Sequence, residues 1–251
     1  MQIAFLGVGE ACDSKLGNTS LLIQAGPSRI LLDCGFTAAH TVFSELSSPN
    51  DLDAVWISHF HGDHFLSLPA LLLRFWETGR DKPLSILGPP GIEEVVSQCV
   101  QLAYSGFWDK FTFPIDFQVL EPGAAHHILG CSWRTVWTEH SRPNLGLRLD
   151  GSQSSLYYSG DGRPGAETWD LVQGCYLIVH EGFRIDRRVH GHGTVQEVME
   201  LAQQAKADSL AVVHMQRDER RHKAAMARAM LDAMPKVRGF LPSPGERVFV
   251  P

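Results

Sequence analysis

Short apolar segments recur along most of the chain, and many end at residues that favour turns. Their length and their content of Val, Ile, Leu, Trp and Tyr are typical of buried β-strands. The predicted strands are Ile3–Leu6, Ser20–Gln24, Ile30–Asp33, Val55–Ser58, Ser85–Leu87, Phe117–Leu120, Trp133–Trp137, Leu145–Leu149, Leu156–Ser159, Leu177–His180 and Leu210–His214. The segments Ala25–Arg29 and Asp150–Ser154 are short enough to close hairpins between neighbouring strands.

Helical periodicity interrupts these strands. One apolar face is formed by Ile92, Val95, Val96, Cys99 and Ala103, and another by Val195, Val198, Met199, Ala202 and Ala205. Leu66–Trp76 and His222–Met234 are also predicted helices, and Thr194 with Glu197 forms a capping-box pattern. Strands mixed with outer helices predict a single α/β domain over residues 1–251, in which two mixed sheets pack face to face between helical layers, an αββα sandwich.

The most distinctive polar segment directly follows the apolar run Ala54–Ile57. It reads Ser58-His59-Phe60-His61-Gly62-Asp63-His64, an H-x-H-x-D-H pattern. Three imidazoles and a carboxylate so close together are poor core residues but good ligands for zinc or manganese. The pattern predicts a metal-dependent hydrolase.

Other potential ligands stand where predicted strands end. His140, Asp161, His180 and His214 each follow or end an apolar run. Loops at strand ends can converge on one site even when they are distant in the sequence. We therefore expect these residues to meet the H-x-H-x-D-H segment.

Several motifs together resemble one family. They are the H-x-H-x-D-H segment, Leu31-Leu32-Asp33-Cys34-Gly35, Ser159-Gly160-Asp161, Val179-His180-Glu181, Gly191-His192-Gly193-Thr194 and Val213-His214. On these motifs the chain resembles the metallo-β-lactamase-fold hydrolases, and within them the ribonuclease Z-like branch. The resemblance spans nearly the whole chain and implies the same αββα fold.

The resemblance also implies two divalent metal ions, zinc or manganese, with iron as a further option. His59, His61 and His140 would hold one ion, Asp63, His64 and His214 the other, and Asp161 would bridge them. A water between two such ions is acidified towards a pKa of about 7 and becomes a hydroxide nucleophile. We count Asp63 among the predicted catalytic residues as well as among the predicted metal ligands.

The remaining site residues also follow from the resemblance. His192 corresponds to a histidine that donates a proton to the leaving oxygen, although His190 lies two residues away and the sequence does not exclude it. Asp33, His180 and Glu181 are candidates for orienting the metal ligands, since a ligating histidine usually gives its second N–H to a carboxylate or carbonyl.

The spacing between two of the predicted ligands, His140 and Asp161, indicates which class of substrate to expect. Ribonuclease Z enzymes that mature transfer RNA carry a protruding arm, in the bacterial type between the positions of His140 and Asp161. Only 20 residues separate these positions here, and a hairpin is predicted there. The similar phosphoribosyl cyclic phosphodiesterases have a Cys-rich zinc site near the N-terminus, where this chain has only Cys12. The prediction is a phosphodiesterase for a small or cyclic phosphodiester.

Alternative activities remain open. The metal cluster alone does not separate this prediction from hydrolysis of a carboxylic ester, lactone or thioester, from transfer-RNA 3′-end cleavage, or from a binding protein of the same fold. Arg142 and Arg184 are candidates for holding the substrate phosphate. Arg217, Arg220, Arg221 and Lys223, at the start of the last helix, are expected to be mainly solvated.

The charge and composition of the chain limit the kinds of molecule that it is expected to bind. The net charge of −6 over 251 residues argues against broad electrostatic binding of nucleic acid and favours a small anionic substrate. No apolar run approaches the roughly 18–20 residues that span a membrane. Five scattered cysteines and the absence of a basic leader favour a cytoplasmic protein with reduced thiols. The apolar Leu66–Trp76 segment suggests a homodimer.

Overall fold

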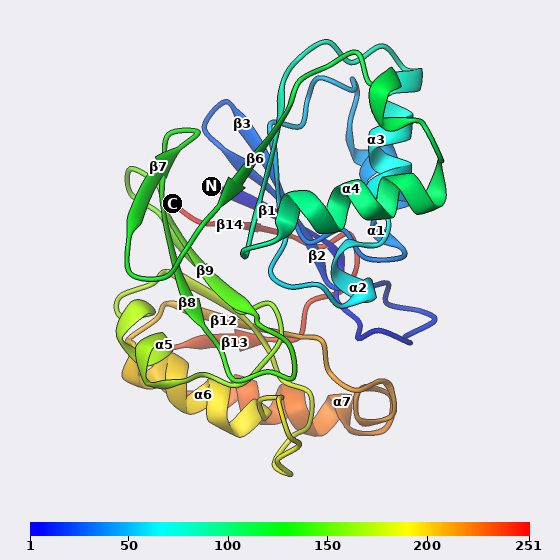
Figure 1. Ribbon diagram of the computed structural model, residues 1–251. Coiled ribbons are helices and arrows are strands. Elements are labelled where there is room, and N and C mark those ends of the chain that lie inside the picture. The colour runs from blue at the N-terminus through cyan, green and yellow to red at the C-terminus, as the bar shows by residue number, and fades with distance from the viewer.

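The computed structural model describes residues 1–251 and contains two seven-stranded sheets packed face to face (Figure 1). In spatial order the first sheet runs β14 (Arg247–Phe249), β1 (Gln2–Gly7), β2 (Ser20–Ala25), β3 (Ser28–Leu32), β4 (Ala54–Trp56), β5 (Leu84–Gly88) and β6 (Ile115–Val119). The second runs β13 (Arg238–Phe240), β12 (Ser209–Val213), β11 (Leu177–Glu181), β10 (Ser155–Tyr158), β9 (Leu145–Asp150), β8 (Cys131–Trp137) and β7 (Ala125–Ile128).

Helices cover the outer face of each sheet. The first sheet carries α1 (Ala38–Glu45), α3 (Leu68–Glu77) and α4 (Ile92–Ala103), and the second carries α5 (Ala166–Leu171), α6 (Val195–Gln204) and α7 (Arg217–Asp232) (Figure 1). The single turn α2 (Gly62–Phe65) and the 3-10 turn η1 (Trp108–Lys110) complete the set. The predicted four-layer αββα sandwich is confirmed.

Successive side chains along a strand point alternately to the core between the sheets and to the outer helices. On β1, Ile3 and Phe5 enter the core between the sheets, whereas Ala4 faces the helices. Across the central core Trp56 meets Trp133 edge to face, with ring centroids 6.3 Å apart. Both tryptophans are fully buried, so the two sheets are held by large apolar contacts.

The strand and helix predictions fail where the local pattern is weak. The strands β7, β13 and β14 and the helices α1 and α5 were not predicted, and most of them are short. The predicted helix over Leu66–Trp76 is α3, which begins at Leu68 with a proline in its first turn. The last helix begins five residues earlier than predicted because the Gln216 side chain accepts hydrogen bonds from the N–H groups of Asp218 and Glu219, both at 2.9 Å.

Parallel pairing places several loops at one edge of the sandwich. β3 pairs with β4, and β10, β11 and β12 pair in succession, all in parallel. β8 runs the same way because it is antiparallel to β9, which is antiparallel to β10. Within each sheet the carboxyl ends of these strands therefore lie at one edge, and potential metal ligands that follow strands of both sheets come together there. None of the helices combines the length and apolar character required to cross a membrane.

Candidate metal centre

Two groups of potential metal ligands meet at this edge. Within each group one atom per residue lies within 4.8 Å of all the others. The groups are His59, His61, His140 and Asp161, and Asp63, His64, Asp161 and His214. Asp161 belongs to both. The structure thus brings together all seven residues that the sequence nominated as ligands.

The first group consists of three histidine rings and the shared carboxylate of Asp161. The Nδ1 atom of His61 lies 3.1 Å from Nε2 of His59 and 3.0 Å from Nε2 of His140. Burial lowers the pKa of all three rings from the ordinary histidine value. Neutral rings with converging nitrogens are the form in which histidine binds a metal.

The second group is richer in carboxylate. Nε2 of His64 lies 3.3 Å from an Asp63 oxygen and 3.4 Å from an Asp161 oxygen, and Nε2 of His214 lies 3.2 and 3.4 Å from the same two atoms. Nε2 of His64 and Oδ1 of Asp161 are buried but make no hydrogen bond. Such groups normally have a partner. A dication between them would satisfy both, so the residues fit two divalent ions.

Three of the ligand rings are oriented by hydrogen bonds at Nδ1, the ring nitrogen that faces away from the centre. Ser58 Oγ lies 3.0 Å from Nδ1 of His59, and the Gly191 carbonyl accepts from Nδ1 of His140 at 2.7 Å. Asp33 Oδ2 accepts from Nδ1 of His64 at 2.7 Å. Each bond uses one ring nitrogen and leaves Nε2 directed at the centre.

Asp33 does more than the sequence indicated. Its carboxylate also accepts from the Ser58 backbone N–H at 2.7 Å and from the Tyr158 hydroxyl at 2.6 Å. Its backbone has a φ of +58°, a left-handed value that is unfavourable for a residue other than glycine. Ser58 could have been suspected as the neighbour of His59, but no sequence signal marked Tyr158.

Asn144 is another residue that the sequence analysis missed. Its Nδ2 donates to the carbonyls of Ser159, at 2.8 Å, and of Asp161, while its Oδ1 accepts from the Asp161 N–H at 3.2 Å. Gly160 packs so closely that an added Cβ would lie 2.4 Å from Asn144 Oδ1. Asn144 and Gly160 together fix the backbone that presents the shared carboxylate.

His192 lies beside the ligands and is held by Glu181. Its Nδ1 is 3.1 Å from Glu181 Oε1, and its ring stacks on Phe183 with centroids 4.3 Å apart. Its centroid is 5.1 Å from that of His140. Burial opposes the charged form, but the hydrogen bond and charge of Glu181 outweigh it and raise the pKa of His192. The alternative residue, His190, is exposed.

Three predicted residues are placed less centrally. His180 is fully buried, donates from Nδ1 to the Glu181 carbonyl at 2.8 Å and makes no hydrogen bond to a ligand, because it faces the helical layer near Tyr157. The structure therefore gives His180 no orienting contact to the ligands. Arg184 pairs with Glu219 at 3.3 Å, and Arg142 is exposed near His140.

Comparison with known proteins places the chain in a family. Residues 1–232 match the family described as Anti-Pycsar protein Apyc1. The chain belongs to this family. It is also 26% identical to a ribonuclease Z of Methanothermobacter thermautotrophicus, with 86% of each chain covered.

Solved structures agree on the fold of this Apyc1-family chain. The metallo-β-lactamase fold protein YhfI of Bacillus subtilis superposes with a TM-score of 0.82 at 18% identity, covering 99% of both chains. The human short-form tRNase Z superposes with a TM-score of 0.80 at 20% identity over 100% of both chains. These structures confirm the metallo-β-lactamase fold, and the sequence similarity to ribonuclease Z bears out the resemblance to that branch.

A large cavity opens beside His140 in the Apyc1-family chain. Its volume is about 990 Å³, and its walls combine aromatic and aliphatic side chains with one cation. Phe60, Phe65, Trp137 and Leu102 contribute apolar surface, and Arg142 contributes the charge. Cavities of this kind are typical binding sites for small molecules.

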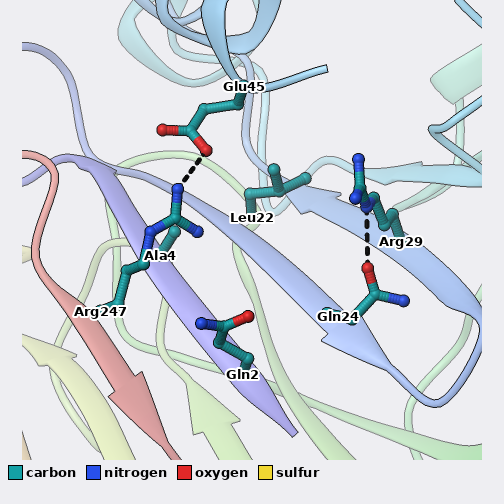
Figure 2. Close-up of a pocket in the computed structure, with 7 residues that line it drawn as sticks. All are labelled: Gln2, Ala4, Leu22, Gln24, Arg29, Glu45 and Arg247. Atoms are coloured by element: carbon teal, nitrogen blue, oxygen red, sulfur yellow. Dashed lines mark hydrogen bonds and ion pairs between the residues drawn. The ribbon is translucent and has the colours of Figure 1, made fainter. Parts of the chain in front are cut away.

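A smaller cavity of about 150 Å³ lies on the helix-facing side of β1 and β2 (Figure 2). Its four charged or polar side chains other than Gln2 are paired with one another: Arg247 bonds to Glu45, and Nε of Arg29 donates to Gln24 at 2.7 Å. No histidine lines it. The cavity beside His140 is therefore the better candidate for the substrate.

Proposed function

We propose that the protein is a dinuclear metal-dependent hydrolase that cleaves a small or cyclic phosphodiester. The observation that carries the proposal is the pair of ligand groups that share Asp161, with His192 beside them. Two divalent ions, zinc or manganese and alternatively iron, suit this set of imidazole and carboxylate ligands. When bound, such ions supply Lewis acidity towards a phosphoryl oxygen and make water more acidic.

The residues around the centre would then have separate roles. Asp161 and Asp63 provide negative charge at the centre, and Asp33, Ser58 and the Gly191 carbonyl hold the rings in place. Glu181 occupies Nδ1 of His192, so Nε2 of that ring is left to give a proton to the leaving oxygen. An alkoxide leaving from phosphorus needs such a donor.

The size of the cavity and its charge support a small substrate. About 990 Å³ accommodates a molecule of nucleotide size, and Arg142 is placed to contact an anionic group. The segment between His140 and Asp161 is taken up by the β9–β10 hairpin, so no arm for transfer RNA emerges there. Transfer-RNA 3′-end cleavage stays the alternative because the curated relatives are named ribonuclease Z.

A panel of substrates tests the proposal. The purified chain is supplied with manganese or zinc and given bis-p-nitrophenyl phosphate, p-nitrophenyl acetate, a lactone and a precursor transfer RNA. We expect about two metal ions per chain and hydrolysis of the phosphodiester. Turnover of the ester or lactone without the phosphodiester would overturn the phosphodiesterase assignment, and preferred cleavage of the RNA would favour the alternative.

Oligomer and location are part of the same proposal. We expect a cytoplasmic homodimer that associates near α3, where the neighbouring side chains of Leu66 and Leu102 are 44% and 87% exposed. The apolar residues of α3 itself are mostly buried within the chain, so the contact would have to use its flanks. Sedimentation of the wild type and of a Leu66→Glu, Leu102→Glu variant tests the dimer, which the variant should dissociate.

A further inference from the structure

A basic cavity lies between the β1–β2 loop and α7. Its volume is about 360 Å³, and it shares no residue with the metal centre or with the cavity beside His140. It is lined by Asp13, Ser14, Lys15, Leu16, Arg217, Asp218, Arg220, Arg221, Ala224, Arg228 and Ser243. Five of these side chains are basic and two are acidic, although the chain as a whole carries a net charge of −6.

The two acidic side chains are already engaged by neighbouring donors. Asp13 Oδ1 accepts from the backbone N–H groups of Lys15, at 2.8 Å, and Leu16, at 2.9 Å. Asp218 Oδ2 accepts from the Gln216 side chain at 3.2 Å. Neither forms an ion pair with Arg220, Arg221 or Arg228.

Arg220 departs most clearly from the sequence-based expectation. The sequence predicted a solvated side chain, but Arg220 is only 8% exposed. Its Nη2 donates to the Pro242 carbonyl at 2.7 Å, whereas its Nη1 is buried and has no hydrogen-bond partner. A buried guanidinium with an unused donor is costly unless an acceptor is supplied. Arg220 is also one of the residues that line the cavity.

We propose that this cavity binds a phosphate group, held by Arg220, Arg221 and Arg228 of α7 together with Lys15 of the opposing loop. Guanidinium groups match phosphate oxygens with paired, charge-assisted hydrogen bonds. Ala224 lies on the same side of α7 between Arg221 and Arg228, and its small side chain leaves room for the anion. Burial and the nearby charge of Arg228 lower the pKa of Arg220, whereas the charges of Asp13 and Glu246 act in the opposite direction, as a bound anion also would.

The phosphate group has two potential sources. One source is a free phosphate ion. The other is a second phosphate of a substrate held at the metal centre, and this second source rests on the proposed function. α7 begins three residues after His214, and Arg217 pairs with Glu10 of the β1–β2 loop at 2.7 Å. The cavity is thus built on the segments next to the metal centre.

Calorimetric titration with inorganic phosphate tests the site in the metal-loaded 251-residue chain. The test variant is Arg221→Gln, Arg228→Gln; both side chains are exposed, so the fold should persist. Lys223→Gln is the matched control, because it removes one charge from the same helix outside the cavity. Ala224→Leu fills the cavity and keeps every charge. Any binding at the metal centre is common to all four proteins.

We expect the double variant to bind phosphate at this site at least about tenfold more weakly, as the loss of charged hydrogen bonds implies. Ala224→Leu should also weaken binding, whereas Lys223→Gln should match the wild type. Equal phosphate binding by the double variant and by Lys223→Gln would overturn the proposal. If no protein hydrolyses a phosphodiester but this binding pattern holds, the proposed function fails and the phosphate site stands.

The two sources are separated by kinetics. The double variant and the wild type are compared on bis-p-nitrophenyl phosphate and on a dinucleotide carrying a 5′-phosphate. A fall in kcat/KM on the dinucleotide alone assigns the cavity to a second phosphate of the substrate. Unchanged kcat/KM on both, together with the loss of phosphate binding, assigns it to the free ion.

Discussion

The carboxylate of Asp33 accepts a hydrogen bond from Nδ1 of His64 at 2.7 Å, and neither side chain is exposed. Asp33 follows β3 and His64 lies in α2, so the bond joins the end of β3 to α2. Because the same carboxylate is also held by Ser58 and Tyr158, it is a rigid acceptor that keeps the His64 ring in one orientation.

Replacing Asp33 tests this relationship. Asp33→Asn should reduce the affinity for the second metal ion about 10- to 100-fold, the usual cost of losing such a partner. Competition with a chromophoric chelator measures the affinity. Tyr158→Phe is the control, since it removes one donor to Asp33 but leaves the bond to His64. Equal metal affinity in Asp33→Asn and wild type would contradict the orienting role.

The two ligand groups predict different metal contents. His61→Ala removes a ligand of the first group only, whereas Asp161→Ala removes the residue that both groups share. Elemental analysis should therefore find about one ion in the first variant and fewer in the second. Both variants should lose phosphodiesterase activity while circular dichroism shows a retained fold. Two ions in purified Asp161→Ala would show that this carboxylate does not bridge the ions.

His192 is predicted to act without binding metal. His192→Ala should keep both ions but slow turnover about 10²–10⁴-fold, the range for a lost general acid. The matched control is His190→Ala, because that side chain is exposed and should be dispensable. Loss of metal from His192→Ala would instead place this ring among the ligands, consistent with its proximity to Glu181 and His214 in a third, smaller group.

The sequence was most informative where chemistry and strand pattern coincide. The H-x-H-x-D-H segment and the polar residues after buried strands could be predicted to meet, because parallel strands end at one edge. Tyr158 could not be foreseen: it sits within a strand as an ordinary apolar position, and its contact with Asp33 spans 125 residues. Asn144 likewise acts through backbone carbonyls that only the folded chain brings near.

Two predictions were wrong for different reasons. His180 ends an apolar strand next to Glu181, and the sequence does not show which of two adjacent residues faces the site. Strand alternation sends Glu181 to the centre and His180 to the helical layer. Arg220 was expected in solvent because Arg usually is, but the Pro242 carbonyl and the loop facing α7 bury it.

The buried His180 ring predicts acid sensitivity. Burial lowers the pKa of His180 from 6.5 to about 4, so the folded chain keeps it neutral while the unfolded chain binds a proton below pH 6.5. Stability is therefore lost as pH falls from 6.5 towards 4, on the order of 2 kcal/mol by pH 5. His180→Phe cannot titrate, and denaturant unfolding should show a smaller loss between pH 7 and 5 than in wild type. An equal loss in both proteins would contradict the assignment.

Trp137 is predicted to contribute to substrate binding but not to the chemical step. It is 39% exposed, lines the cavity beside His140 and offers a flat apolar surface to an aromatic group of the substrate. Trp137→Ala should raise KM for an aryl phosphodiester about threefold to tenfold, as expected for one lost aromatic contact, and leave kcat nearly unchanged. Phe249→Ala, which removes an exposed aromatic ring far along the first sheet at its β14 edge, is the control and should change neither constant. A fall in kcat at constant KM would mean that Trp137 supports the metal centre itself, since His140 follows it by only three residues.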